Sequence, residues 1–348
     1  MGVSLEEMKA RLVRYRDLVP CKTAFIDTRT PGSDKKENFT IIGPGVSESP
    51  GQHVHVAIPH GFNIGGARQP KGTVNSQHSH ETEEVFLVHS GEWAFRTGVN
   101  ADDGEVILRA GDVISIPTNV FRGFECLSDG DSFLFAILGG DDPGHVTWAP
   151  YVFEQAKDHG LVLTESGRLI DTAAGESIPE DETICQPVGE DELDRFDTVD
   201  SETLEKFVIR ADDMGESHPS LLSGMAPGIS EAPLLGKANA EEGIGEGVIP
   251  TDHGFHFRLV ELASNSLVPA HSRDEEEVIF VHSGAIAISW EDETLTLGEG
   301  DTLTVPKGLV RAWSNPSDDT ASVFVVRGGD APTGPSWCDG TGREHQAA

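Results

Sequence analysis

Two histidines spaced two residues apart, followed by a glutamate, are the residues of this sequence best suited to chemistry. His78 and His80 begin the segment HSHETEEVFLVHSG (78–91), and Glu84 follows four residues later. Residues two apart on a strand face the same side, so both imidazoles would share one face of a sheet, and Glu84 could return a carboxylate to it from the next strand. Two histidines and a carboxylate can bind a divalent metal with positions left open. The alternative is a pair of hydrogen-bonded structural histidines, and the matched glutamate favours the metal.

The same segment occurs a second time in altered form. HSRDEEEVIFVHSG fills 271–284, and aligning 60–91 on 253–284 without a gap gives twelve identities in 32 positions. Downstream, GDVISIPTNVFRGF (111–124) aligns with GDTLTVPKGLVRAW (300–313), and upstream PGVSESP (44–50) recurs as PGISEAP (227–233). A unit of roughly 80 residues or more is therefore used twice.

Both copies have the pattern of β-strands. Apolar residues alternate or run in blocks of five or six, as in EVFLVHSGEWAF and EVIFVHSGAIAI, bounded by Gly, Asp, Asn and Pro. Many short strands at close spacing predict an all-β protein with two barrels, each able to hold a compact ligand or metal. Helices are expected only over 4–18 and 150–161, where His159-Gly160 would end the second.

Composition shifts place the domain boundary. We predict an N-terminal barrel over 1–165 with a helical N-terminus, an acidic linker over 166–205, and a C-terminal barrel over 206–348. Segments rich in Gly, Pro and Ser precede each barrel, at 28–52 and at 211–247. They are interpreted as connectors, with a lid as the alternative.

The charge of the chain excludes several partners. Its 348 residues include 25 basic and 59 acidic side chains, a formal net charge of -34. Such a surface repels nucleic acid and anionic membranes, so neither is expected as a partner. No segment approaches the ~18 apolar residues of a membrane span, and no leader is recognisable at the N-terminus, which makes a cytoplasmic location the default expectation. The four cysteines form no C-x-x-C pair.

The first motif resembles the cupin superfamily. The pattern G-x5-H-x-H-x3,4-E-x6-G of that family is matched at every position, by Gly72, His78, His80, Glu84 and Gly91. The second pattern, G-x5-P-x-G-x2-H, matches at Gly111 and Pro117, but Asn119 replaces the glycine and Arg122 the histidine. The chain is thus similar to a bicupin, which implies two double-stranded β-helix (jelly-roll) barrels.

The resemblance implies a metal-dependent enzyme with one site in the first barrel. It favours a dioxygenase-like oxidoreductase acting on a small oxygenated or carboxylated compound, aromatic compounds included, with His78, His80 and Glu84 holding the metal. Iron(II) is favoured; manganese, nickel, zinc and cobalt also suit the ligands. The alternatives are a non-catalytic small-anion binding or regulatory protein and a cupin isomerase or lyase. Arg122 either orients an anionic substrate as a catalytic residue or pairs with an acid such as Glu84.

The second copy departs from the motif. It keeps His271, Glu276 and Glu277, but Arg273 replaces the second histidine, Arg311 the motif-two histidine and Asn265 the leading glycine. Guanidinium groups repel a divalent ion, so this barrel is not expected to bind a metal of the same kind. Scaffold, interface or an anion pocket lined by the two arginines remain as roles. The resemblance also permits a homo-oligomer.

Overall fold

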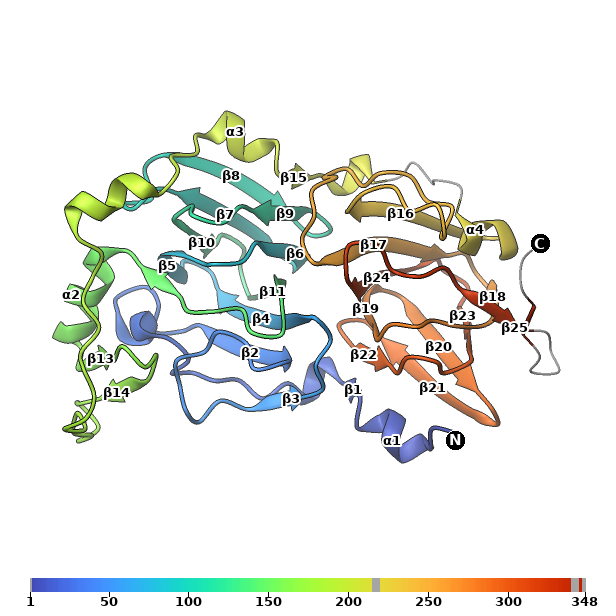
Figure 1. The fold of residues 1–348 in the computed structure, drawn as a ribbon, viewed down its shortest axis with the longest axis horizontal. Helices are drawn as coiled ribbons and strands as arrows, with labels where there is room; N and C mark the ends of the chain where they lie inside the picture. Colours follow the sequence, from blue (N-terminus) through green and yellow to red (C-terminus); the bar gives the residue numbers. More distant parts are fainter. Residues whose placement is uncertain (1, 215–219, 339–343, 346–348) are drawn as a thin grey trace. The chain divides into compact units, whose positions relative to one another are not determined.

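The computed structural model describes residues 2–214, 220–338 and 344–345 (Figure 1). Two compact units divide the chain: residues 19–211, and residues 1–18 together with 212–348. Each unit holds one barrel made of two mainly antiparallel sheets, which confirms the predicted all-β, two-barrel fold. Within the described residues no helix is long and apolar enough to cross a membrane.

The first barrel packs a seven-stranded sheet against a five-stranded one in the described chain. The larger sheet has the order β15 (Val208–Ile209), β9 (Val113–Ile116), β6 (Glu84–Ser90), β11 (Asp131–Gly139), β4 (Phe62–Pro70), β2 (Glu37–Ile42) and β3 (Val54–Val56). The smaller has the order β12 (Thr147–Trp148), β5 (Val74–Ser79), β10 (Arg122–Cys126), β7 (Glu92–Thr97) and β8 (Gly104–Arg109). Phe86, Phe95 and Phe124, from both sheets, pack between them.

The second barrel repeats this arrangement with two six-stranded sheets in its described part. One has the order β1 (Leu12–Val13), β22 (Thr302–Val305), β19 (Glu277–Ser283), β24 (Ala321–Gly328), β17 (Phe255–Leu262) and β16 (Ile229–Leu235). The other has the order β21 (Glu293–Gly298), β20 (Ala285–Trp290), β23 (Arg311–Ser314), β18 (Leu267–Ser272), β25 (Ser336–Cys338) and β26 (Glu344–His345). Period two is clear in β20, where Ile286, Ile288 and Trp290 enter the core.

The remaining elements lie outside the barrels' sheets. In the first unit they are η2 (Ile26–Arg29), α2 (Pro150–Asp158), the hairpin β13 (Leu161–Leu163) and β14 (Leu169–Asp171), η3 (Glu190–Arg195) and α3 (Ser201–Glu205). In or beside the second they are α1 (Leu5–Lys9), η1 (Tyr15–Asp17), η4 (Ala211–Asp213) and α4 (Leu221–Met225). Pro150 opens α2 and Gly160, at φ +77°, follows its end, as the sequence indicated.

The N-terminal segment corrects two predictions. The helix expected over 4–18 is confined to Leu5–Lys9, and the chain then extends so that β1 pairs with β22, Leu12 opposite Leu303. Met8 is buried in the core of the second barrel. Residues 1–18 therefore belong to the second unit and not to the first barrel, because a sheet edge and an apolar core outweigh the local helical pattern.

The predicted acidic linker belongs to the first unit. Part of 166–205 packs there: Leu169 joins the apolar cluster around Trp148, and Leu204 the barrel core. The expected connector at 28–52 contains β2, an integral strand, and 211–247 contains β16; of the latter, residues 215–219 lie outside the described residues. PGVSESP is a loop after β2, whereas PGISEAP runs into β16, so these two segments are not structural equivalents.

Where asparagine replaces a motif glycine, the backbone keeps the glycine conformation. Asn119 has φ +60° and Asn265 has φ +56°, both in the left-handed region, while Gly72, the counterpart of Asn265, has φ +75°. Asparagine tolerates this region better than most other residues. These departures from the motif therefore preserve the turns that deliver the following strands.

Candidate metal centre

Strands of both sheets bring the three predicted ligands together inside the first barrel. His78 lies on β5, His80 follows the end of that strand, and Glu84 begins β6. All three side chains are buried, and their ligand atoms lie within 4.8 Å of one another. Among the residues the structure describes, they form the one group of three or more His, Cys, Asp or Glu side chains with this geometry. The spacing in sequence thus corresponds to convergence in space.

The histidines are held in a form that can donate to a metal. His78 Nδ1 lies 2.7 Å from the Ser76 carbonyl, so Nδ1–H donates there and Nε2 keeps its lone pair. His80 is buried, its Nδ1 has no hydrogen-bond partner in the described chain, and its Nε2 lies 3.6 Å from Glu84 Oε2. Burial, and then the Arg122 guanidinium, hold the pKa of each histidine well below its usual value. Both imidazoles are therefore neutral, as metal ligands must be.

A buried network behind β5 fixes this strand. Asp27 Oδ2 accepts from Ser76 N at 3.0 Å and its other oxygen accepts from Lys36 Nζ. Lys36 also donates to Asn75 Oδ1 at 2.9 Å. Burial lowers the pKa of Lys36, which Asp27 opposes. The strand that carries His78 is thus anchored through residues that sequence reasoning did not identify.

Arg122 pairs with Glu84. Its Nη2 donates to Glu84 Oε2 at 2.7 Å and its Nη1 to the His78 carbonyl at 3.2 Å, with the side chain 1% exposed. Burial raises the pKa of Glu84, and Arg122 opposes the shift. Of the two roles left open by the sequence, the structure contains the ion pair; a substrate-orienting role for Arg122 stays a prediction. Because a carboxylate has two oxygens with several lone pairs, Glu84 can accept from Arg122 and still bind a metal.

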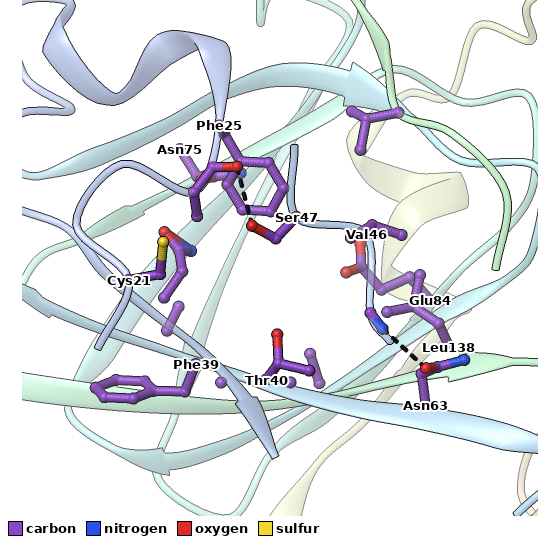
Figure 2. A pocket seen from close by; sticks show the side chains of 18 of the residues that line it. Cys21, Phe25, Phe39, Thr40, Val46, Ser47, Asn63, Asn75, Glu84 and Leu138 are labelled. Carbon is purple, nitrogen blue, oxygen red and sulfur yellow. Dashed lines mark hydrogen bonds between the residues drawn. The ribbon is translucent and has the colours of Figure 1, made fainter. Parts of the chain in front are cut away.

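The donors line one part of a largely apolar cavity. The space measures about 80 Å³, which is room for one compact molecule. Figure 2 shows Glu84 and Leu138 on one side and Cys21 and Phe39 on the other. Phenylalanines 25, 86 and 124, together with Trp148, add aromatic surface, and the described lining includes no Lys or Arg.

A loop after β2 forms another part of the cavity lining. Gly45, Val46 and Ser47 line the space, and Gly45 N donates to Asn63 Oδ1 at 3.0 Å (Figure 2). The next residue, Glu48, is buried and accepts from Trp148 Nε1 at 2.6 Å, while the Trp148 ring packs on His78 at 5.1 Å between centroids. Burial raises the pKa of Glu48 to about 8. Glu48 and Trp148 thus join the loop to the candidate metal site, and neither role was predicted.

The second barrel keeps the contacts that surround the candidate metal site of the first. His271 Nδ1 lies 2.8 Å from the Pro269 carbonyl, and the Trp337 ring packs on His271 at 5.3 Å. Arg311 Nη2 donates to Glu277, and its Nη1 reaches the His271 carbonyl at 3.2 Å. The strand register makes Glu277 opposite Arg327 the equivalent of Glu84 opposite Leu138. The two barrels therefore share these contacts and differ in the side chains that lie next to them.

Arginines fill the second barrel where the first is open. By the same register, Arg258 stands where the first barrel has Gly65, Arg327 where it has Leu138, and Arg273 where it has His80; all three counterparts line the cavity of the first barrel. Sequence reasoning identified Arg273 but missed Arg258 and Arg327. The sequence did contain a signal for both residues, because Arg258 lies between Phe257 and Leu259 and Arg327 directly follows the apolar run VFVV. The absence of a metal of the same kind from this barrel stays a prediction.

Comparison with known proteins identifies the family. The family described as "Cupin domain" matches twice, at residues 67–138 and 258–327. Oxalate decarboxylase from Bacillus subtilis is similar at 14% identity and a TM-score of 0.53, over 93% of this chain and 77% of that one. Oxalate decarboxylase from Lactobacillus farciminis is similar at 12% identity and a TM-score of 0.54, over 92% and 87%. No curated protein sequence matches the chain. The chain therefore contains two cupin domains, in agreement with the resemblance predicted from its motifs.

Proposed function

We propose that this bicupin is a metal-dependent enzyme with a single divalent ion in its first barrel, held by His78, His80 and Glu84. The observation that carries the proposal is the convergence of three buried donor groups on an apolar cavity. Two further observations support it. His80 Nδ1 is buried without a hydrogen-bond partner, and the lowered pKa of His78 and of His80 keeps both imidazoles neutral, so that each can donate a lone pair to a metal. When bound, the ion would supply Lewis acidity and open positions for oxygen or substrate.

The electrostatics of the site favour an anionic head group on the substrate. Glu84 and Arg122 cancel one another, so a divalent ion would leave about two uncompensated positive charges in a buried site. A carboxylate, enolate or phenolate at the open positions would reduce this excess. The rest of the molecule would lie against a lining of mainly apolar side chains with a few amides and hydroxyls, which suits a compact and largely apolar body. We infer a substrate with one anionic head and a small apolar body.

Dioxygenase-like chemistry suits this substrate better than decarboxylation of a dicarboxylate. The similar solved structures are oxalate decarboxylases, and one is described by its Mn(II) centres. In this chain, however, a second carboxylate would lie in an apolar lining without a Lys or Arg among its described residues, at a large desolvation cost. A lyase of the neighbours' type is the second candidate. Iron(II) remains the favoured metal and manganese the first alternative.

Elemental analysis of protein purified without a histidine tag tests the proposal. We expect about one iron or manganese per chain, lost in His78→Ala and His80→Ala. His271→Ala is the matched control, because it removes the equivalent histidine of the second barrel and should keep the metal. Oxygen consumption with small phenols and monocarboxylates, absent in His78→Ala, would establish an oxygenase, whereas carbon dioxide release from oxalate without oxygen uptake would establish the lyase. A chain without metal in all four proteins would contradict both.

A further inference from the structure

The interior of the second barrel is a cage of charged side chains around Glu242. Arg258 Nη2 donates to Glu242 Oε2, while the Nη1 atoms of Arg273 and Arg327 both lie beside Oε1, the second at 2.5 Å. All four side chains are at most 4% exposed. Three guanidiniums from three different strands or strand ends thus converge on one carboxylate. This is the arrangement by which proteins bind a free carboxylate.

The cage carries more positive than negative charge. Its four arginines, Arg258, Arg273, Arg311 and Arg327, face three glutamates, Glu231, Glu242 and Glu277, which gives 4 − 3 = 1 net positive charge. Burial, together with Arg311 and Arg273, keeps His271 neutral through a lowered pKa. Removal of Glu242 would raise the excess to two. A buried excess of this size requires an anion.

Glu242 reaches the cage from a loop and not from the barrel wall. It lies between β16 and β17, in a segment closed by backbone hydrogen bonds: Gly236 N to Ile249 O at 3.0 Å and Ile249 N to Leu234 O at 3.0 Å. Asn239 and Ile244 bond reciprocally on either side of Glu242. The neighbouring Glu241 and Gly243 are exposed, so Glu242 alone of the three points inward. The loop places one carboxylate in the cage, much as a bound ligand would be placed.

We propose that the second barrel is a carboxylate-binding barrel whose ligand is built into the chain. Glu242 occupies a site with the chemistry to bind a small monocarboxylate, and the loop 236–249 is the tether that delivers it. Tethering gives the resident carboxylate an effective concentration of millimolar or above, so a free acid does not displace it in the native protein. The site becomes available only when the carboxylate is removed.

Chemical rescue by acetate tests this proposal. Glu242→Ala deletes the equivalent of one acetate molecule from the cage, and we expect its melting temperature to fall. Acetate should then raise the melting temperature of this variant saturably, with a midpoint in the roughly millimolar range expected for so small a ligand. Sodium chloride at equal ionic strength should raise it much less. Isothermal titration of acetate into Glu242→Ala should give one site per chain.

Three controls make the outcome specific. Glu242→Gln fills the space with a neutral amide, so it should be destabilised but not rescued. Glu241→Ala removes the adjacent exposed carboxylate, and it should melt like the wild type with no response to acetate. If Glu242→Ala does not fold in plain buffer, its soluble yield on refolding with acetate, compared with chloride, replaces the melting curve. Equal effects of acetate and chloride, or an equal acetate response in the wild type, would overturn the proposal.

Discussion

Arg122 and Arg311 make the same two contacts in the two barrels. Each donates from Nη2 to the motif glutamate, Glu84 or Glu277, and lies 3.2 Å through Nη1 from the carbonyl of the motif histidine. The second barrel has an arginine in place of the second histidine, yet it keeps this pair. The contact therefore does not depend on the second motif histidine. A common structural role explains why arginine replaces the second-motif histidine in both copies.

Replacement of Arg122 by methionine should destabilise the metal-free first barrel by about 3–5 kcal/mol, because Glu84 loses the buried guanidinium that pairs with it. Arg311→Met should cost less, since Arg273 and Arg327 each keep a nitrogen within 3.9 Å of Glu277. Urea unfolding of the two variants measures the difference. An Arg122→Met protein with wild-type stability and no activity would instead assign Arg122 to substrate orientation.

Arg273→His should not create a metal site, although it restores the histidine pair of the cupin motif. Arg258 and Arg327 would still fill the interior, and their charge would oppose a divalent ion. The metal content per chain should stay at the wild-type value. The converse change, His80→Arg, should remove the metal and also destabilise the first barrel, because Glu84 is already paired with Arg122. A second metal per chain in Arg273→His would refute the argument from charge.

The second barrel should lose stability in acid. Burial would raise the pKa of Glu242 and of Glu277, but the surrounding arginines outweigh it and hold each pKa at about 2. For Glu242 the charges that face it are Arg327, Arg258 and Arg273. A carboxylate with a lowered pKa stabilises the fold above its unfolded pKa, near 4.5, and this contribution disappears as the pH falls toward 2. The loss is on the order of 3 kcal/mol for each group.

Calorimetry between pH 5 and pH 2 measures this acid transition. Glu242→Ala should show a shallower dependence of melting temperature on pH over the same range, because one of the two titrating groups is gone. An unchanged slope would show that Glu242 keeps an ordinary pKa in the folded protein.

Glu48 predicts the opposite trend at higher pH. Burial raises its pKa to about 8, so at neutral pH it is protonated in the folded chain and ionised in the unfolded one. Such a group stabilises the fold fully below about pH 4.5, and the contribution falls as the pH rises through 8. Glu48→Gln should flatten the dependence of unfolding free energy on pH between 5 and 8.5. The slope is the readout, because the amide also leaves Trp148 Nε1 or Ile26 N without an acceptor.

Local pattern predicted that the three candidate metal ligands converge, because their convergence is itself local. His78 and His80 share a strand face, and Glu84 begins the next strand after a short turn. The partner of Arg122 could not be chosen from sequence, since β10 and β6 lie in different sheets. Substrate orientation and an internal ion pair were therefore both candidate roles for Arg122 on the residue types alone. Only the closed barrel shows which acid the guanidinium reaches.

The burial of Glu242 could not be predicted from the sequence. Its loop has no hydrophobic period, and Glu241, Glu242 and Glu246 differ in burial without any difference in type. Arg258 and Arg327, by contrast, lie directly beside apolar residues within strands and could have been recognised as buried cations that need acids. The identity of those acids follows from tertiary structure. The helix predicted over 4–18 was too long for the same reason, because the edge of β22, with which β1 pairs, is remote in sequence.

The pairing of β1 with β22 has a consequence for the order of events during synthesis. Leu12 leaves the ribosome before its partner Leu303, which follows almost 300 residues later. At about 5–20 residues per second, the delay is roughly 15 to 60 seconds. Residues 19–211 can form their own barrel in that time. β1 must remain unpaired until β22 emerges, so it completes its sheet only after the first barrel has had time to form.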